Sequence, residues 1–227
     1  MWNMNKLYQF RGYILGALAL ALLAVPGKPL PEFLVPAFLL PSGEVFQPLS
    51  LDQMEFYCIG LALYVAGALL RIKTRQYIGA HSRGNKLEAD ELVMVGPYAY
   101  TRHPLYFSNT LLAVGAIFIA LGPNLMAFPF VLVVFAFEWI LAREEDRFLE
   151  GKFGDTWRNW ARETPMIPLN RIAIYKKQKQ IRPLQKEYPL VFAPKRSFCA
   201  AFLADRSTWG WLLFFNLLLY LKKLYIG

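Results

Sequence analysis

Apolar residues gather in four long runs, separated by polar or Pro-containing segments. The runs cover about Tyr13 to Val25, Met54 to Leu70, Leu105 to Leu121 and Leu125 to Leu141. Each is at or below the roughly 17 to 25 residues that a membrane-spanning helix needs, so flanking aromatic residues must extend it. The pattern predicts an all-α protein, a polytopic membrane helical bundle with four spans.

A fifth apolar run, Trp209 to Leu221, is only thirteen residues long and is followed by Lys222 and Lys223. It is compatible with a helix lying in the membrane interface, a re-entrant helix or a short fifth span. The short length favours the interfacial or re-entrant form.

Composition agrees with a membrane protein. The 227 residues are 56% hydrophobic and 18% charged, with a mean hydropathy of +0.30, which is too apolar for a typical soluble domain. Cys58 and Cys199 form no metal-ligand spacing and no disulfide framework, so the sequence predicts no metal site.

The net charge is +9, and lysine and arginine are distributed unevenly along the chain. The segment from Arg71 to Pro104 carries six and the segment from Ala142 to Thr208 carries fourteen, whereas the Pro-rich segment from Pro26 to Gln53 carries only Lys28. This alternation predicts that the basic segments face the cytoplasm and that the Pro-rich segment is an outer loop.

The basic stretch from Arg171 to Arg196 is the strongest hint of nucleic-acid binding. Beside a membrane such a stretch more often lies on anionic headgroups, so we expect lipid and no nucleic acid as its partner. His81 lies in the basic loop from Arg71 to Arg83 and is expected to be solvated.

The segment from Leu92 to Tyr106, LVMVGPYAYTRHPLY, leads into the third span. Thr101 is suited to cap a helix and Pro104 to occupy its first turn. Arg102 and His103 beside such a helix start predict a site for a small anion. The alternative is that both side chains meet lipid phosphates while the tyrosines form an aromatic belt.

The segment from Glu138 to Pro168 leaves the fourth span and carries an unexpected acidic cluster. At 100° per residue, Glu138, Glu145 and Leu149 share one helix face. Carboxylates near hydrocarbon and anionic lipid require cationic partners. The alternative is that Arg143 and Arg147 satisfy the cluster by local pairing, which applies more to Glu144 and Asp146 than to Glu145. Trp157 and Trp160 then form a packing face, a membrane anchor or a ligand wall.

In these two segments the sequence resembles the membrane methyltransferases that include isoprenylcysteine carboxyl methyltransferase and the phospholipid N-methyltransferases. The resemblance covers roughly Leu92 to Pro168. The matching elements are Gly96-Pro97-Tyr98, Arg102-His103-Pro104-Leu105-Tyr106, an acidic pair, Phe153-Gly154 and Thr164-Pro165-Met166-Ile167-Pro168.

The match has two departures. Counting back from Phe153-Gly154 places the family's acidic pair on Glu145-Asp146, whereas the letters alone place it on Glu144-Glu145. Glu145 is common to both registers and is therefore the strongest acidic candidate. Trp157 and Trp160 stand where the family has tyrosines.

The resemblance implies S-adenosylmethionine as cofactor. It implies that Glu145, assisted by Glu144 or Asp146, binds the cofactor's ammonium, and that Arg102, His103 and the helix start bind its carboxylate. Tyr98 and Tyr106 would line the sulfonium and the adenosine. The implied cofactor-binding residues are Gly96, Pro97, Tyr98, Arg102, His103, Pro104, Tyr106, Glu144 and Glu145, and the implied catalytic residues are His103, Arg102 and Arg143.

The sequence thus predicts an integral membrane methyltransferase acting on a lipophilic acceptor at the cytoplasmic face. The membrane would be the bacterial inner membrane or, in a eukaryote, the endoplasmic reticulum. The alternative is a non-catalytic carrier or assembly protein that uses Glu138 as an intramembrane polar site. Within one membrane-embedded domain we distinguish N-terminal spans and outer loop (1–91), a methyltransferase core (92–168) and a basic extension with the C-terminal helix (169–227).

Overall fold

The computed structural model of the protein describes residues 4–25, 51–78, 89, 91–122, 125–168, 177, 179, 183 and 194–225. Within these residues the chain forms helices and no strand, which confirms the all-α prediction. Most of the predicted outer loop from Pro26 to Gln53, the loop that holds His81, and most of the stretch from Arg171 to Arg196 lie outside the described residues.

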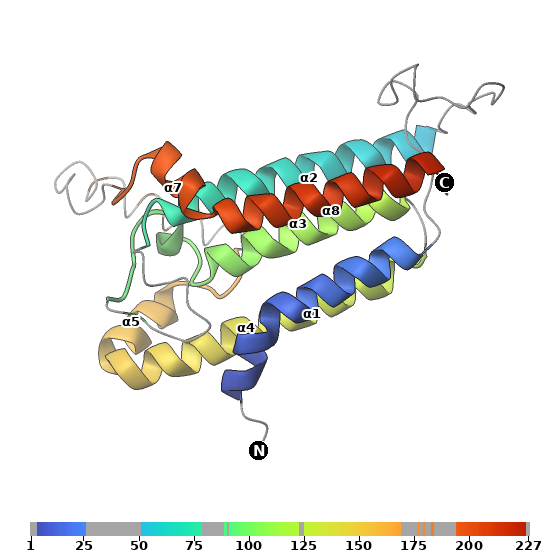
Figure 1. The fold of residues 1–227 in the computed structure, drawn as a ribbon. Coiled ribbons are helices and arrows are strands. Elements are labelled where there is room, and N and C mark those ends of the chain that lie inside the picture. Colours follow the sequence, from blue (N-terminus) through green and yellow to red (C-terminus); the bar gives the residue numbers. More distant parts are fainter. Residues whose placement is uncertain are drawn as a thin grey trace.

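Among the described residues, five long helices run side by side and three short ones lie at one end (Figure 1). The long helices are α1 (Met4–Ala24), α2 (Leu51–Arg75), α3 (Pro104–Leu121), α4 (Ala127–Phe153) and α8 (Arg206–Tyr225). The short helices are η4 (Gly96–Ala99), α5 (Asp155–Glu163) and α7 (Phe198–Ala204).

Two of the helices, α2 over Met54–Arg75 and α3, are long and apolar enough to cross a membrane. The apolar part of α1 is shorter, from Phe10 to Ala24. Helix α4 begins within two residues of the predicted fourth span but continues for twelve residues beyond Leu141, so that span and acidic cluster form one helix. All four predicted runs are therefore helical.

Helices α2 and α3 approach each other at backbone contact distance because glycines line their interface. A Cβ on Gly115 would lie 2.6 Å from the Gly60 carbonyl oxygen, and a Cβ on Gly67 would lie 2.8 Å from the Leu112 nitrogen. Small residues permit this packing in membranes, where lipid is as apolar as the side chains and close van der Waals contact favours association. The α2–α3 pair is the scaffold on which the site is built.

The C-terminal apolar run lies in α8, one uninterrupted helix that lies alongside α2 and α3 (Figure 1). Asn216 on α8 donates a hydrogen bond to the Tyr64 hydroxyl on α2 at 2.7 Å, and Leu219 packs in a core cluster with Ile117 and Leu121. An interfacial helix would lie across the end of the bundle. Helix α8 instead runs along the bundle beside α2 and α3 (Figure 1).

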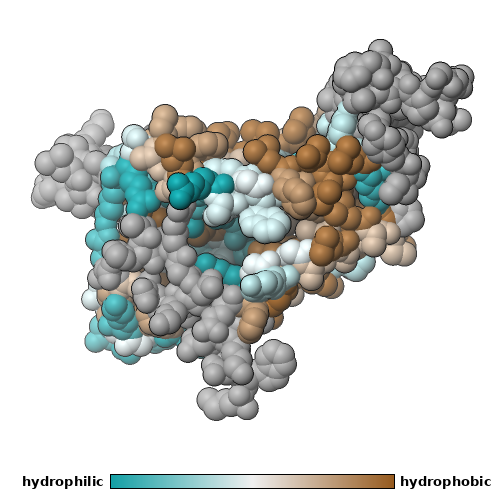
Figure 2. All heavy atoms as spheres, in the orientation of Figure 1, coloured by the Kyte–Doolittle hydropathy of each residue, from teal (hydrophilic) through white to brown (hydrophobic). Residues whose placement is uncertain are grey.

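One end of the bundle is polar and its body is apolar. Figure 2 shows hydrophilic residues at the end where α5 lies and hydrophobic residues over the long helices. Large apolar side chains are exposed along α2, α4 and α8, for example Val65, Leu132 and Leu213. Helix α2 ends, α3 begins and α4 ends at the polar end, as the predicted alternation of spans requires.

A buried ion cluster fastens the α7–α8 corner to α2. Asp205 Oδ2 lies 2.7 Å from Arg71 Nε and 3.0 Å from Arg75 Nε, and Arg71 also donates to the Thr208 hydroxyl at 3.2 Å. Removing an acid from such a buried cluster leaves uncompensated cations. The C-terminal helix is thus anchored by charge as well as by apolar contact.

Candidate functional site

The start of α3 joins the two predicted chemical segments. Pro104 occupies the first turn, as predicted, and His103 is the residue before it. The Arg102 backbone N–H donates to the Pro165 carbonyl at 2.9 Å, and the Thr101 hydroxyl donates to the Met166 carbonyl at 2.7 Å. The prediction that Thr101 caps α3 was wrong, because its hydroxyl instead holds the segment that follows α5.

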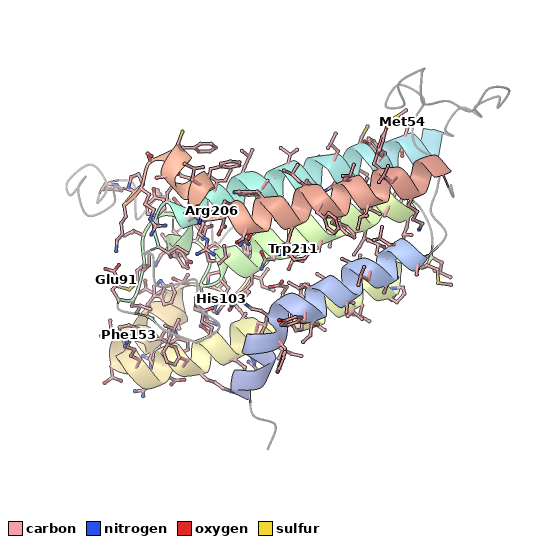
Figure 3. The ribbon with its side chains drawn as sticks, in the orientation of Figure 1. Met54, Glu91, His103, Phe153, Arg206 and Trp211 are labelled. Carbon is pink, nitrogen blue, oxygen red and sulfur yellow. The ribbon has the colours of Figure 1, made fainter. Side chains whose placement is uncertain are left out.

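His103 lies between two carboxylates from α4. Its Nε2 donates to Asp146 Oδ1 at 2.9 Å, and its Nδ1 lies 4.0 Å from Glu145 Oε2. The residue is only 4% exposed. The alternative in which His103 meets lipid phosphates is therefore wrong, because the imidazole is buried and oriented by protein acids. Figure 3 places His103 toward the polar end, away from Met54.

Arg102 shares the acid that holds His103. Its guanidinium lies 3.1 Å from Asp146 Oδ2, and its carbon lies 5.4 Å from the centre of the Trp157 ring. Asp146 thus accepts one hydrogen bond on each carboxylate oxygen, from Arg102 on Oδ2 and from His103 on Oδ1. The local-pairing alternative is therefore wrong for Asp146, because its partners come from a segment more than forty residues away.

Glu144 and Glu145 have different surroundings on the same turn of α4. Glu144 forms an ion pair with Arg147 three residues later, as the local-pairing alternative predicted. The Glu145 side chain is 33% exposed and contacts the His103 ring edge. Arg143 lies on the exposed side of α4. Glu145 is therefore the acid of this turn that combines access with contact to the buried motif.

Gly96 and Tyr98 pack against other residues at the polar end of the bundle. Gly96 has φ +63°, and a Cβ there would lie 2.6 Å from ring atoms of Tyr77, so the turn with Pro97 requires glycine. Burial raises the pKa of the Tyr77 hydroxyl, and the neighbouring Tyr100 raises it further. Tyr98 packs against the cluster of Leu149, Trp157 and Trp160.

The structure thus separates two tyrosines that were expected to line one ligand. Tyr98 lies with the tryptophan cluster, whereas Tyr106 lines a pocket between α3 and α4. The tryptophans form a buried packing face, and Trp157 additionally supports the guanidinium of Arg102.

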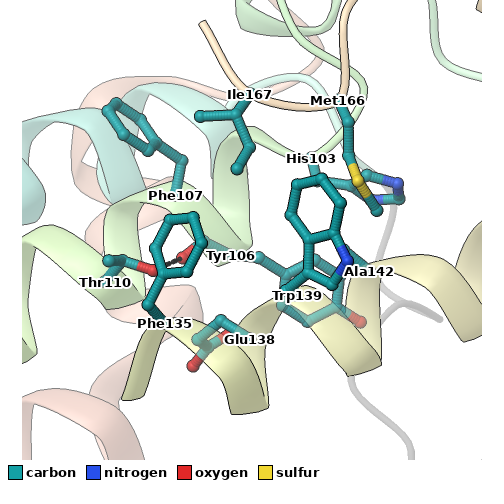
Figure 4. A pocket seen from close by; sticks show the side chains of 10 residues that line it. All are labelled: His103, Tyr106, Phe107, Thr110, Phe135, Glu138, Trp139, Ala142, Met166 and Ile167. Atoms are coloured by element: carbon teal, nitrogen blue, oxygen red, sulfur yellow. Dashed lines mark hydrogen bonds between the residues drawn. The ribbon is translucent and has the colours of Figure 1, made fainter. Parts of the chain in front are cut away.

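The pocket between α3 and α4 begins at His103 and is mostly apolar (Figure 4). The pocket is open on one side, and the space of about 320 Å³ between and in front of its lining side chains includes the outside space at its mouth. Aromatic and aliphatic side chains from three segments line it, together with His103, Glu138 and the phenol of Tyr106. The lining residues are His103, Tyr106, Phe107, Thr110, Phe135, Glu138, Trp139, Ala142, Met166 and Ile167.

Several of these residues, and one that touches them, were not predicted from sequence. Asn109 on α3 donates to Glu138 Oε2 at 3.4 Å and accepts a hydrogen bond from Arg71 on α2. Asn109 is one of the few strongly polar residues inside the third apolar run, and that was the signal available. Nothing in the sequence marked Met166 and Ile167 as pocket residues beyond their place in the Pro-x-x-Pro segment.

Two kinds of comparison give no relative: no curated protein and no solved structure matches the chain. A family model does match. The model described as phospholipid methyltransferase covers residues 56–156, from α2 to the first residues of α5. This range contains the Arg102–His103 motif, the acidic cluster of α4 and most of the pocket. Residues 56–156 thus match the phospholipid methyltransferase family, which confirms the resemblance inferred from the motifs and indicates a membrane methyltransferase.

Proposed function

We propose that the protein is an S-adenosylmethionine-dependent methyltransferase that acts on a lipophilic acceptor at the cytoplasmic face of a membrane. The observation that carries the proposal is the junction of two sites at His103. On one side lie the charged residues Arg102, Glu145 and Asp146, and on the other lies the apolar pocket. The cofactor would bind on the charged side and the acceptor in the pocket.

The charged side has the donors and acceptors that this cofactor requires. Buried atoms without a hydrogen-bond partner among the described residues include Arg102 Nε, Trp157 Nε1, Trp160 Nε1 and Thr164 Oγ1. These are N–H and O–H groups suited to a carboxylate or to ring nitrogens, and leaving them unpaired costs free energy. Glu145 adds an accessible acceptor for an ammonium. The residues present therefore fit the cofactor.

Each charged residue has a distinct task in this proposal. Glu145 binds the cofactor's ammonium through charge-assisted hydrogen bonds, and Arg102 uses its free Nε–H on the carboxylate. Asp146 acts as a positioning residue, because both Arg102 and His103 are already bound to it. Glu144 is occupied by Arg147, so its predicted role beside Glu145 requires that this surface pair opens.

When bound, S-adenosylmethionine supplies an activated methyl group on a cationic sulfur. The protein's own contribution is alignment and exclusion of water, because displacement at a methyl group requires the two reactants in line. The buried His103 imidazole stands where the charged side meets the pocket. It is the side chain placed to receive a proton from an acceptor that carries one.

The catalytic role predicted for Arg143 stays a prediction. Its side chain is on the exposed side of α4 rather than in the pocket. From there it can act on an approaching headgroup but not on the reacting atoms in this conformation.

The proposal is tested by measuring S-adenosylmethionine binding to the full chain in detergent or nanodiscs by calorimetry. Wild type should bind, and Glu145→Ala and His103→Ala should each weaken binding by about tenfold or more, since each loses a charged or buried polar contact. Glu150→Gln is the matched control, because Glu150 lies on α4 but pairs with Arg158 at the surface. A folded wild-type protein that binds none of the cofactor would refute the proposal.

A further inference from the structure

The short helix α7 exposes an apolar face at the polar end of the bundle. Phe198 is 52% exposed and Leu203 is 63% exposed, and Cys199 and Phe202 are exposed beside them. Residues four apart lie on one side of a helix, so these four side chains form one continuous surface, which we call the α7 face. Ala201, on the other side of α7, is buried. In Figure 2 hydrophobic residues lie over α7 beside hydrophilic ones.

Both ends of α7 are fixed to the last turn of α2. The Arg196 backbone N–H donates to the Gln76 carbonyl at 3.1 Å, and Gln76 Nε2 donates to the Arg196 carbonyl at 3.3 Å. Behind α7, Asp205 binds Arg71 and Arg75. The apolar segment of α2 that is long enough to cross a membrane ends at Arg75. Helix α7 therefore lies level with the end of a span, where a bilayer changes from acyl chains to headgroups.

The start of α8 continues the apolar surface beyond α7. The Trp209 ring stacks on Phe202 with 5.2 Å between ring centres, and Trp209 Nε1 donates to the Phe202 carbonyl at 2.8 Å. Farther along α8, Trp211 and Leu213 are exposed, and Figure 3 shows Trp211 beyond Arg206 in the direction of the apolar body. Tryptophan is enriched where a membrane protein meets the headgroup level. Exposed apolar side chains thus lie on both sides of the α7–α8 corner.

The exposed charges next to α7 in the chain are positive. Arg196 precedes α7 by two residues and is half-buried, and Arg206 follows Asp205 and is exposed. Neither arginine forms an ion pair with an acid in the part of the chain that the structure describes. Asp205 itself is buried and bound to other arginines. An apolar helix face with basic residues at both ends is complementary to acyl chains and to anionic headgroups.

We infer that the α7 face is embedded in the lipid interface at the polar end of the bundle, and that Arg196 and Arg206 bind anionic phospholipid headgroups there. Phe198, Phe202 and Leu203 lie among the ends of the acyl chains. This lipid contact is separate from the Arg102–His103 site and does not depend on the proposed methyl transfer. Helices α7 and α8 also lie outside residues 56–156, the range that the family model covers.

The test uses the native Cys199 as the position of a nitroxide label, in full-length Cys58→Ser protein. The protein is placed in nanodiscs of phosphatidylcholine with roughly one-third phosphatidylglycerol. Electron paramagnetic resonance then compares collisions of the label with oxygen, which concentrates in acyl chains, and with a water-soluble nickel chelate. The control label is on Gly151→Cys in a Cys58→Ser, Cys199→Ser background, because Gly151 is exposed on α4 at the same end.

The ratio of oxygen to nickel collisions should be at least about fivefold higher at Cys199 than at Gly151→Cys, because a helix in the interface buries its apolar face below the headgroups. Equal ratios at the two positions would overturn the inference, since the α7 face would then lie in water and be free for another partner.

Two substitutions test whether the α7 face holds the helix in the lipid. Phe198→Glu combined with Leu203→Glu should lower the ratio at Cys199 by about threefold or more, because both carboxylates favour water. Both side chains are on the surface, so the fold is retained. Met94→Glu is the matched control, since Met94 is an exposed apolar residue of the polar end outside α7, and it should leave the ratio unchanged. An unchanged ratio in the double variant contradicts the inference.

A fluorophore on Cys199 tests the headgroup contact. Brominated phosphatidylglycerol should quench it about twofold more than brominated phosphatidylcholine at the same mole fraction, because two cations attract the anionic lipid. Arg196→Gln combined with Arg206→Gln should remove this preference. Arg147→Gln, which changes an exposed arginine of α4, should keep it. Equal quenching by both lipids in the Cys58→Ser protein would overturn the assignment of anionic headgroups to these arginines.

Discussion

The two interfaces of α3 are built in opposite ways. Toward α2 the helix uses glycines, and the backbones approach so closely that a single Cβ would overlap carbonyl oxygens. Toward α4 it uses aromatic and polar side chains that leave a pocket and hold buried acids. The comparison teaches that one helix serves as a fixed scaffold on one side and as a ligand wall on the other. A site needs such a rigid support, because small displacements of reacting groups are costly.

The largest effect is expected from breaking the scaffold side. Gly115→Val should destabilise the protein by about 3 kcal/mol, because the new side chain meets the Gly60 carbonyl oxygen and the Tyr64 backbone with no flexible group to move. Thermal unfolding in detergent, followed by intrinsic fluorescence, measures the change. Gly151→Ala is the matched control on α4, where nothing lies within 4 Å of the new Cβ, and it should leave the melting temperature unchanged or slightly higher. Equal melting temperatures for both variants would show that α2 and α3 do not need the close approach.

A smaller loss is expected from removing the acid that organises the site side. Asp146→Asn should cost about 2 kcal/mol of stability, because it leaves Arg102 and His103 without the carboxylate that both contact, while their residual exposure limits the penalty. It should also weaken S-adenosylmethionine binding. Glu144→Gln, which removes an ion pair with the exposed Arg147 on the same turn, should cost less than Asp146→Asn, because it loses one partner within its own helix rather than two from another segment. If the two variants lose equal stability, Asp146 is no more than a surface charge.

The smallest of these effects tests how the pocket segment is held. Thr101→Val should cost about 1 kcal/mol, because it leaves the Met166 carbonyl without the hydroxyl that donates to it while keeping the side-chain shape. Thr110→Val is the control, since the Thr110 hydroxyl bonds only within α3 to the Tyr106 carbonyl among the contacts described. Unfolding temperatures and cofactor affinity of both variants provide the measurement. A larger loss in the control would contradict the role assigned to Thr101.

Much of the fold was predictable because it depends on local patterns. Apolar runs of span length and the Arg-His-Pro helix start are readable along the chain, and each is a helix or a helix start in the structure. The acidic cluster was also readable as unusual. The partners of these acids could not be predicted, because the helical periodicity that places Glu138 and Glu145 on one face says nothing about which residues of another helix lie opposite.

The partly wrong expectations share that reason. Local pairing was the alternative for Asp146, and Thr101 was expected to cap its own helix, because both rules concern neighbours within one turn. The structure gave each a partner more than forty residues away. The family resemblance grouped Tyr98 and Tyr106 around one ligand; in the structure Tyr98 packs against the tryptophan cluster and Tyr106 lines the pocket.

By itself the sequence determined the helical membrane class, the basic face and the two motif segments, because hydrophobic length, charge bias and turn chemistry act over short stretches of chain. Only the tertiary structure decided that Asp146 joins Arg102 to His103 and that Glu138 is reached through Asn109 from Arg71. These contacts arise from the packing of α2, α3 and α4 against one another. Each helix on its own exposes several polar side chains, and the packing of the helices decides which of them come into contact. These contacts bring the separate motifs together into one site.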